Sequence, residues 1–212
     1  MALIDSGSPA PDFSLPDAKG APHTLASYRG RPVVVYFYPK DDTSACTAEA
    51  CAFRDALPKF EKLHRAAVLG ISPDSAKSHA KFAAKYSLNF TLLADTPGAS
   101  GTPAVCDAFG VWAEKSMYGK KYMGVVRTTY LIDAQGRVAR RWDKVKVDGH
   151  ADEVLAALSE LTGAGPAPKA ATAKPAVKKS AATKPTTKKA PAKKASRKPA
   201  QKTVKKSSKP RR

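Results

Sequence analysis

The amino-acid sequence changes character at residue 164. Residues 164–212 hold 17 of the 37 basic residues and none of the 18 acidic ones, so the other 20 basic and 18 acidic side chains leave residues 1–163 with a net charge of +2. The later segment has no aromatic residue, and its only larger aliphatic side chains are Val177 and Val204. It buries too little apolar surface to offset the entropy of an ordered chain, so we expect a disordered basic tail. Residues 1–163 are long enough to form one folded domain.

The composition also excludes several classes of protein. No run of about 18 apolar residues is present, so we expect no membrane-spanning segment. The start of the chain, Met1 to Asp5, lacks the basic and apolar regions of a secretory signal, and we expect a cytoplasmic location. Three cysteines are too few to staple a small secreted fold. In a reducing compartment they are either buried core residues or reactive thiols.

Apolar runs and turn residues predict a sequence of strands and helices. Strands are expected over residues 33–38, 66–72, 90–93, 127–132 and 138–142, and helices after Thr43, near residue 75, near residue 104 and near residue 148. Pro58 is expected to break or kink the first helix. Alternating strands and helices, followed by a hairpin and a closing helix, indicate an α/β thioredoxin-like fold with a mixed central sheet flanked by helices. The order alone leaves a flavodoxin-like fold open.

Cys46 follows the expected central strand and lies near the start of a helix. The unpaired amides there favour a thiolate, which is the nucleophilic form. Thr43 and a second thiol, Cys51, lie close to it in sequence, and Pro39 is placed to wall the sulfur from water. Thr43, Pro39 and the nearby Glu49 also have ordinary structural roles. Thr43 would cap the helix, Pro39 would end the strand, and Glu49 would be a first-turn acid that suits the helix dipole.

Two motifs give these residues a family resemblance. Pro39, Thr43 and Cys46 fill the pattern Pro-x-x-x-Thr-x-x-Cys, and Arg127 opens the run Arg-Thr-Thr-Tyr-Leu-Ile-Asp 81 residues after Cys46. The chain resembles peroxiredoxins over about residues 3–161, and more narrowly the bacterioferritin comigratory protein, or peroxiredoxin Q, subfamily. One departure is local, because Ser44-Ala45 stands where the family usually has Pro-Gly.

The resemblance implies a thiol peroxidase that reduces hydrogen peroxide and organic hydroperoxides. Cys46 would be the peroxidatic thiolate, and Arg127 would hold positive charge beside it. Thr43 would hydrogen-bond the thiolate and the peroxide, Pro39 would exclude water, and Glu49 would join Thr43 and Arg127 around the substrate. No flavin, haem or metal is implied, and the histidines show no ligand spacing with the cysteines.

The resemblance also implies that Cys51 is the resolving thiol of an atypical two-cysteine enzyme, a monomer recycled by thioredoxin. Residues five apart on an ideal helix have Cα atoms roughly 8–9 Å apart, and a disulfide needs about 7 Å or less. We therefore expect the helix to unwind from Thr47 to about Phe53 after oxidation. Cys106 is the competing resolving thiol, although a small buried side chain is its more ordinary role.

The tail resembles the Lys-, Ala- and Pro-rich ends of linker histones and bacterial histone-like proteins. Such a segment condenses on a polyanion and releases counterions, so we expect sequence-independent, salt-sensitive DNA binding and association with the nucleoid. Solubilisation and membrane binding are the alternatives, but no apolar anchor supports the membrane. The paired lysines are the expected DNA contacts: Lys178, Lys179, Lys188, Lys189, Lys193, Lys194, Lys205 and Lys206.

Two other functions compete with a peroxidase. One is a nucleoid-associated DNA-binding protein with a vestigial thioredoxin-like body. It is weakened because a degenerate site should have lost Pro39, Thr43, Cys46 or Arg127, and all four are present. The other is a general thiol–disulfide oxidoreductase, which lacks the Cys-x-x-Cys signature that this chemistry prefers.

Overall fold

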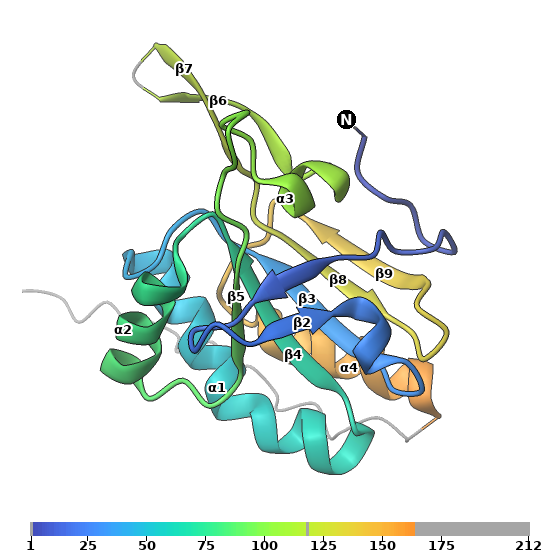
Figure 1. Cartoon of the computed structure of the whole chain (residues 1–212). Coiled ribbons are helices and arrows are strands. Elements are labelled where there is room, and N and C mark those ends of the chain that lie inside the picture. The colour runs from blue at the N-terminus through green and yellow to red at the C-terminus, as the bar shows by residue number, and fades with distance from the viewer. Residues whose placement is uncertain (1, 118, 164–212) are drawn as a thin grey trace, which may run out of the picture. The chain divides into compact units, whose positions relative to one another are not determined.

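The computed structural model describes residues 2–117 and 119–163, and the predicted tail, residues 164–212, lies outside them (Figure 1). The elements in chain order are β1 (Ser14–Pro16), β2 (Pro22–Thr24), the 3-10 helix η1 (Leu25–Tyr28), β3 (Val33–Phe37), α1 (Ser44–His64), β4 (Ala67–Ser72), α2 (Ala76–Tyr86), β5 (Thr91–Ala94), α3 (Ala104–Ala108), β6 (Trp112–Met117), β7 (Lys120–Val125), β8 (Thr128–Ile132), β9 (Val138–Asp143) and α4 (His150–Thr162).

A five-stranded mixed sheet, in the order β5-β4-β3-β8-β9, forms the centre of the fold. Strands β3, β4 and β5 are parallel, whereas β8 runs antiparallel to β3 and β9 antiparallel to β8. The antiparallel pair decides against the doubly wound flavodoxin-like alternative. The prediction of a thioredoxin-like fold is confirmed, and β8 now lies directly beside the central strand β3.

Strand β3 is buried along its whole length because the sheet is covered on both faces. Successive side chains of a strand point to opposite faces. Val35 and Phe37 join a core under η1, α3 and the β1–β2 hairpin. Val34 and Tyr36 join a second core under α1, α2 and α4. Figure 1 shows the β1–β2 hairpin in front of the sheet and α1 and α4 behind it.

Helix α1 corrects the prediction for Pro58. The helix is continuous from Ser44 to His64 and contains Pro58 in its interior, so of the two expected effects, a break or a kink, the break is wrong. A proline costs a helix about 3 kcal/mol, because it removes one hydrogen bond and crowds the preceding turn. Phe53, Leu57 and Phe60, on either side of the proline, are all buried in the second core. This packing outweighs the local cost.

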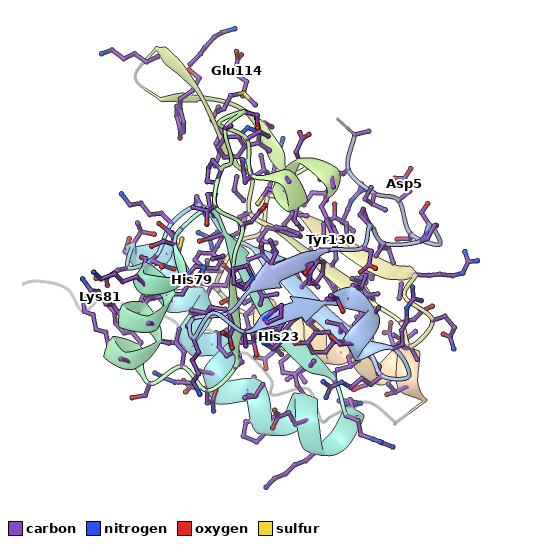
Figure 2. The ribbon with its side chains drawn as sticks, viewed as in Figure 1. Asp5, His23, His79, Lys81, Glu114 and Tyr130 are labelled. Atoms are coloured by element: carbon purple, nitrogen blue, oxygen red, sulfur yellow. The ribbon has the colours of Figure 1, made fainter. Side chains whose placement is uncertain are left out.

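A two-stranded ribbon of β6 and β7 was not predicted from the sequence. Residues 112–117 pair antiparallel with residues 120–125, with Trp112 opposite Val125 and Met117 opposite Lys120. The ribbon projects from the sheet at the top of Figure 1, and Figure 2 shows Glu114 on this projecting part. Its strands are rich in charged and exposed side chains, so they lack the apolar run that marked the buried strands.

Among the described residues, no helix is both long and apolar enough to cross a lipid bilayer.

Gly70 is a position in the central sheet that has no room for a side chain. It pairs with Tyr36 across β3 and β4, and a Cβ atom there would lie 2.7 Å from the Tyr36 ring and 2.8 Å from Leu92. We expect Gly70→Ala to lower the free energy of unfolding by about 1–3 kcal/mol, since neither buried side chain has room to retreat. Urea denaturation measures this loss. Gly98→Ala is the control, because nothing lies within 4 Å of a Cβ there. Equal losses in the two variants would contradict the argument.

Candidate active site

Cys46 is the third residue of α1, the helix that follows strand β3 in the chain. Its side chain is only 1% exposed. The first-turn amides of α1 have no helical acceptors, and the helix dipole places partial positive charge at this end. The structure thus places the Cys46 sulfur at the positive end of this helix.

Arg127 reaches the sulfur from the neighbouring strand. It immediately precedes β8, and its Nη2 donates a hydrogen bond to Cys46 Sγ at 3.1 Å. Its Nη1 pairs with the carboxylate of Glu49. The antiparallel pairing of β8 with β3 brings together residues that lie 81 positions apart in the chain. Of the predicted site residues, the structure thus joins Cys46, Glu49 and Arg127 in one cluster.

Glu49 pairs with the other terminal nitrogen of the Arg127 guanidinium, Nη1. Its side chain is 1% exposed, and its Oε1 has no hydrogen-bond partner among the described residues. Burial raises the pKa of Glu49 to about 7, although Arg127 acts in the opposite direction. Burial would lower the pKa of Arg127, but the carboxylate beside it raises it. The guanidinium therefore stays charged between a carboxyl that is costly to ionise and the sulfur.

Thr43 and Pro39 lie on the loop between β3 and α1, and both are exposed. Thr43 is the N-cap of α1, but its side chain makes no capping hydrogen bond. Its hydroxyl instead donates to the carbonyl oxygen of Lys40 at 3.1 Å. The Cys46 sulfur accepts its side-chain hydrogen bond from Arg127. The Thr43 hydroxyl, although close in sequence, does not donate to the sulfur in this structure.

This loop is fastened to helix α2 by a buried polar cluster. The Asp41 carboxylate accepts from His79 Nδ1 at 2.9 Å and from the Tyr38 hydroxyl at 2.8 Å. His79 Nε2 lies 3.2 Å from the Leu93 carbonyl oxygen, so both ring nitrogens face oxygen atoms. In Figure 2 His79 points into the body, whereas Lys81 on the same helix points outward. The sequence analysis missed this cluster, because its members are spread over residues 38–93.

Two further residues near Arg127 also escaped the sequence analysis. Lys115 on β6 donates to the Val125 carbonyl oxygen at 2.7 Å, and burial followed by the Arg127 charge lowers its pKa. His150 hydrogen-bonds the Thr129 hydroxyl at 2.8 Å, and burial followed by Arg127 lowers its pKa to about 4. Lys115 lies on the β6–β7 ribbon, which was not predicted from the sequence. His150 was considered only as a metal ligand, and no motif marked it for this place.

The three cysteines are all free thiols. Cys51 is half-buried and lies on α1, the same unbroken helix as Cys46. Cys106 on α3 is fully buried, and its burial, with Asp95 nearby, raises the pKa of its thiol far above the usual range. Its backbone N–H donates to Asp95, which also accepts from the N–H of Val105. Cys106 therefore has the surroundings of an inert core residue.

Within residues 2–117 and 119–163, no group of three or more His, Cys, Asp or Glu side chains is arranged to hold a metal ion.

Comparisons with known proteins agree with this site. Residues 6–141 match the AhpC/TSA family. The putative peroxiredoxin bcp of Coxiella burnetii is 48% identical over 155 residues, which are 73% of this chain and 99% of that protein. Peroxiredoxin Bcp of Bacillus subtilis is 43% identical over 159 residues, covering 75% and 98%. A structure of the bacterioferritin comigratory protein of Xanthomonas campestris superposes with a TM-score of 0.67 at 44% identity, covering 74% of this chain and 98% of that one.

A thioredoxin-like sheet that presents a buried cysteine at a helix start, beside an arginine, defines a thiol peroxidase of the peroxiredoxin class. The matched relatives are covered almost completely by residues of this chain. The chain belongs to the Bcp, or peroxiredoxin Q, family of peroxiredoxins. The family resemblance seen in the sequence is confirmed.

The raised pKa of Glu49 predicts a pH-dependent stability. The native carboxyl binds its proton more tightly than the unfolded one, so ionising it between pH 4.5 and about 7 costs the native state free energy. The free energy of unfolding should fall as pH rises through this window. We expect Glu49→Gln to remove about 2 kcal/mol of that fall. Urea denaturation at pH 5 and pH 8 measures it, with exposed Glu61→Gln as the control. Parallel pH profiles for wild type and Glu49→Gln would refute the assignment.

Proposed function

We propose that this thiol peroxidase reduces hydrogen peroxide and organic hydroperoxides through a sulfenic acid on Cys46. The observation that carries the proposal is the 3.1 Å hydrogen bond from Arg127 Nη2 to Cys46 Sγ. A buried sulfur that accepts from a guanidinium is held as the nucleophilic thiolate. The structure described for the Xanthomonas campestris relative concerns alkyl peroxide reduction, which supports organic hydroperoxides among the substrates.

In the first step the Cys46 thiolate attacks one oxygen of the hydroperoxide. An S–O bond forms, the O–O bond breaks, and the leaving oxygen takes a proton and departs as water or an alcohol. Cys46 is oxidised to the sulfenic acid. Arg127 stabilises the negative charge as it moves from sulfur to the leaving oxygen. Its side chain is 13% exposed, so part of it lies open to solvent.

The other predicted residues act around this step. Glu49 orients the guanidinium through its buried ion pair. Thr43 exchanges its exposed bond to the Lys40 carbonyl for one to the peroxide, which its position at the helix start allows. Pro39, in the bend after β3, shields the sulfur from water once substrate is bound.

In the second step Cys51 resolves the sulfenic acid. Its thiolate attacks the Cys46 sulfur, an S–S bond forms, the S–O bond breaks, and the hydroxide takes a proton and leaves as water. Both thiols lie on the continuous helix α1, where residues five apart are too distant to bond. Unwinding over about residues 47–53 therefore accompanies this step. A dithiol reductant, which we propose to be thioredoxin, returns the disulfide to two thiols by exchange.

Peroxide treatment of the protein tests this cycle. We expect one equivalent of hydrogen peroxide to give a Cys46–Cys51 disulfide, mapped by mass spectrometry, with loss of amide-exchange protection over residues 46–53. Cys46→Ser should abolish peroxide consumption with thioredoxin, because it removes the nucleophile. Cys51→Ser should consume about one equivalent and then stop, because no disulfide forms for the reductant to attack.

Cys106→Ser is the matched control for these variants, since Cys106 is a buried thiol outside the cluster. Its turnover should equal that of the wild type. Sustained turnover by Cys51→Ser would move the resolving role to Cys106 or to an external thiol. A Cys46–Cys51 disulfide with unchanged amide protection would refute the unwinding.

We further propose that residues 164–212 form a basic tail, separate from the domain of residues 1–163, that binds DNA without sequence preference. The support is compositional: 17 basic and no acidic residues, with no aromatic side chain for base stacking. Such binding would keep a peroxide-consuming enzyme close to the nucleoid.

Truncation tests the tail. Residues 1–163 alone should no longer retard duplex DNA in a gel at low salt, whereas the full chain should retard it and lose that ability steeply as salt rises. The peroxidase rate should stay nearly unchanged, because the site residues all precede residue 164. Equal retardation by the truncated and full chains would defeat the proposal.

A further inference from the structure

Asp41 fixes the loop that precedes Cys46, and it does so with both its backbone and its side chain. Its backbone N–H donates to Asp74 Oδ2 at 2.7 Å. Its carboxylate accepts from His79 Nδ1 at 2.9 Å and from the Tyr38 hydroxyl at 2.8 Å. The side chains of His79 and Asp41 are 0% and 5% exposed. Hydrogen bonds to a carboxylate that is shielded from water are strong, so this residue has a well-defined place.

The hydroxyl of Thr43 depends on the same part of the loop. It donates to the Lys40 carbonyl oxygen at 3.1 Å. The peptide group that carries this oxygen is also the one whose N–H, on Asp41, donates to Asp74. A peptide group is planar, so contacts that fix its N–H also fix its C=O. The Thr43 carbonyl oxygen accepts from the N–H of Thr47 at 2.8 Å, so Thr43 lies between a loop set by Asp41 and the helix that carries the reactive sulfur.

The next residue of the loop is held in a strained conformation. Asp42 has a φ of 56°, in the left-handed region that residues other than glycine rarely adopt. Its carboxylate pairs with Lys85 Nζ at 2.7 Å. Such conformations persist where surrounding contacts hold them, and they cluster at sites that clamp a ligand. Helix α2 thus contacts both aspartates of the loop, through His79 inside the body and through Lys85 at the surface.

His79 is itself fixed on both sides of its ring. Nδ1 is the donor to Asp41, because an ionised carboxylate only accepts hydrogen bonds. Nε2 lies 3.2 Å from the carbonyl oxygen of Leu93 on β5. Within the part of the chain that the structure describes, its polar contacts are with Asp41, Tyr38 and Leu93, and none is with the Cys46 sulfur. An effect of His79 on the reaction therefore has to pass through the loop.

We infer that His79 is a positioning residue for peroxide reduction, which acts through Asp41 to hold the Thr43 hydroxyl where the hydroperoxide binds. This rests on the proposed function. The step concerned is the first one: an S–O bond forms at Cys46, the O–O bond breaks, and the leaving oxygen takes a proton and departs as water or an alcohol. His79 exchanges no proton with the substrate. Without its bond to Asp41 the hydroxyl would sample more positions, and the hydroperoxide would be aligned for attack less often.

Two substitutions separate the two ring nitrogens. An asparagine amide reaches about as far from the backbone as Nδ1, and a glutamine amide about as far as Nε2. His79→Asn can therefore keep the bond to Asp41, whereas His79→Gln can keep the contact with Leu93.

Rapid-quench mass spectrometry of the full chain measures the reaction of Cys46 with hydrogen peroxide. We expect His79→Gln to lower its second-order rate constant about tenfold, which corresponds to about 1.4 kcal/mol. His79→Asn should keep most of the wild-type rate. His64→Gln replaces a buried histidine at the other end of α1, so it is the matched control and should leave the rate unchanged.

Two further measurements separate positioning from general damage to the fold. Iodoacetamide needs no Thr43 hydroxyl, so in a Cys51→Ser background His79→Gln should leave the alkylation rate of Cys46 unchanged. In a Thr43→Val background, His79→Gln should alter the peroxide rate by no more than about twofold, because the hydroxyl through which it acts is gone.

Four results would overturn the inference: no loss of rate in His79→Gln, equal losses in His79→Gln and His79→Asn, slowed alkylation, or an undiminished loss in the Thr43→Val background. Failure of Cys46 to react with peroxide in the wild type would instead show that the proposed function is wrong.

Discussion

The shared guanidinium of Arg127 is the interaction on which the site depends. It lies between the Cys46 sulfur and the Glu49 carboxylate, which are both almost fully buried on the first turns of α1. Buried charges are costly unless they are paired, so each member of the cluster makes the burial of the others tolerable. The same contact ties strand β8 to helix α1. The chemistry and the local packing are therefore properties of one three-residue cluster.

The proposed Cys46–Cys51 disulfide places two opposing demands on helix α1. Its amino-terminal end must stay ordered to hold the Cys46 sulfur against Arg127, yet the geometry of an α-helix keeps Cys46 and Cys51 too far apart to bond. Helix α2 contacts the chain on both sides of residues 43–53. His79 and Lys85 pair with Asp41 and Asp42, and the carbonyl oxygen of Tyr86 accepts a hydrogen bond from Arg54. The buried face of α1 further along packs against α4 and the sheet. These contacts support the proposal that the helix opens only in its first turns.

Long apolar strands were predicted well, and polar elements were not. Strand β3 was recognisable because burial on both faces demands an uninterrupted apolar run. The β6–β7 ribbon exposes many of its side chains, so its sequence carries no comparable demand, and Lys115 was missed with it. The effect of Pro58 was misjudged because local propensity was weighed without the packing of Phe53 and Phe60, which holds the helix together.

The sequence by itself determined the motif from which the reactive group is predicted: Cys46 with Pro39 and Thr43 before it, and Arg127 in a second run far along the chain. It also determined the abrupt change to a basic tail. Only the tertiary structure decided that Arg127 meets the sulfur, that Glu49 completes the cluster, and that the Thr43 hydroxyl bonds Lys40 instead. The reason is physical. Residue types along a chain specify which bonds are possible, but the pairing of β8 with β3 selects which of them form.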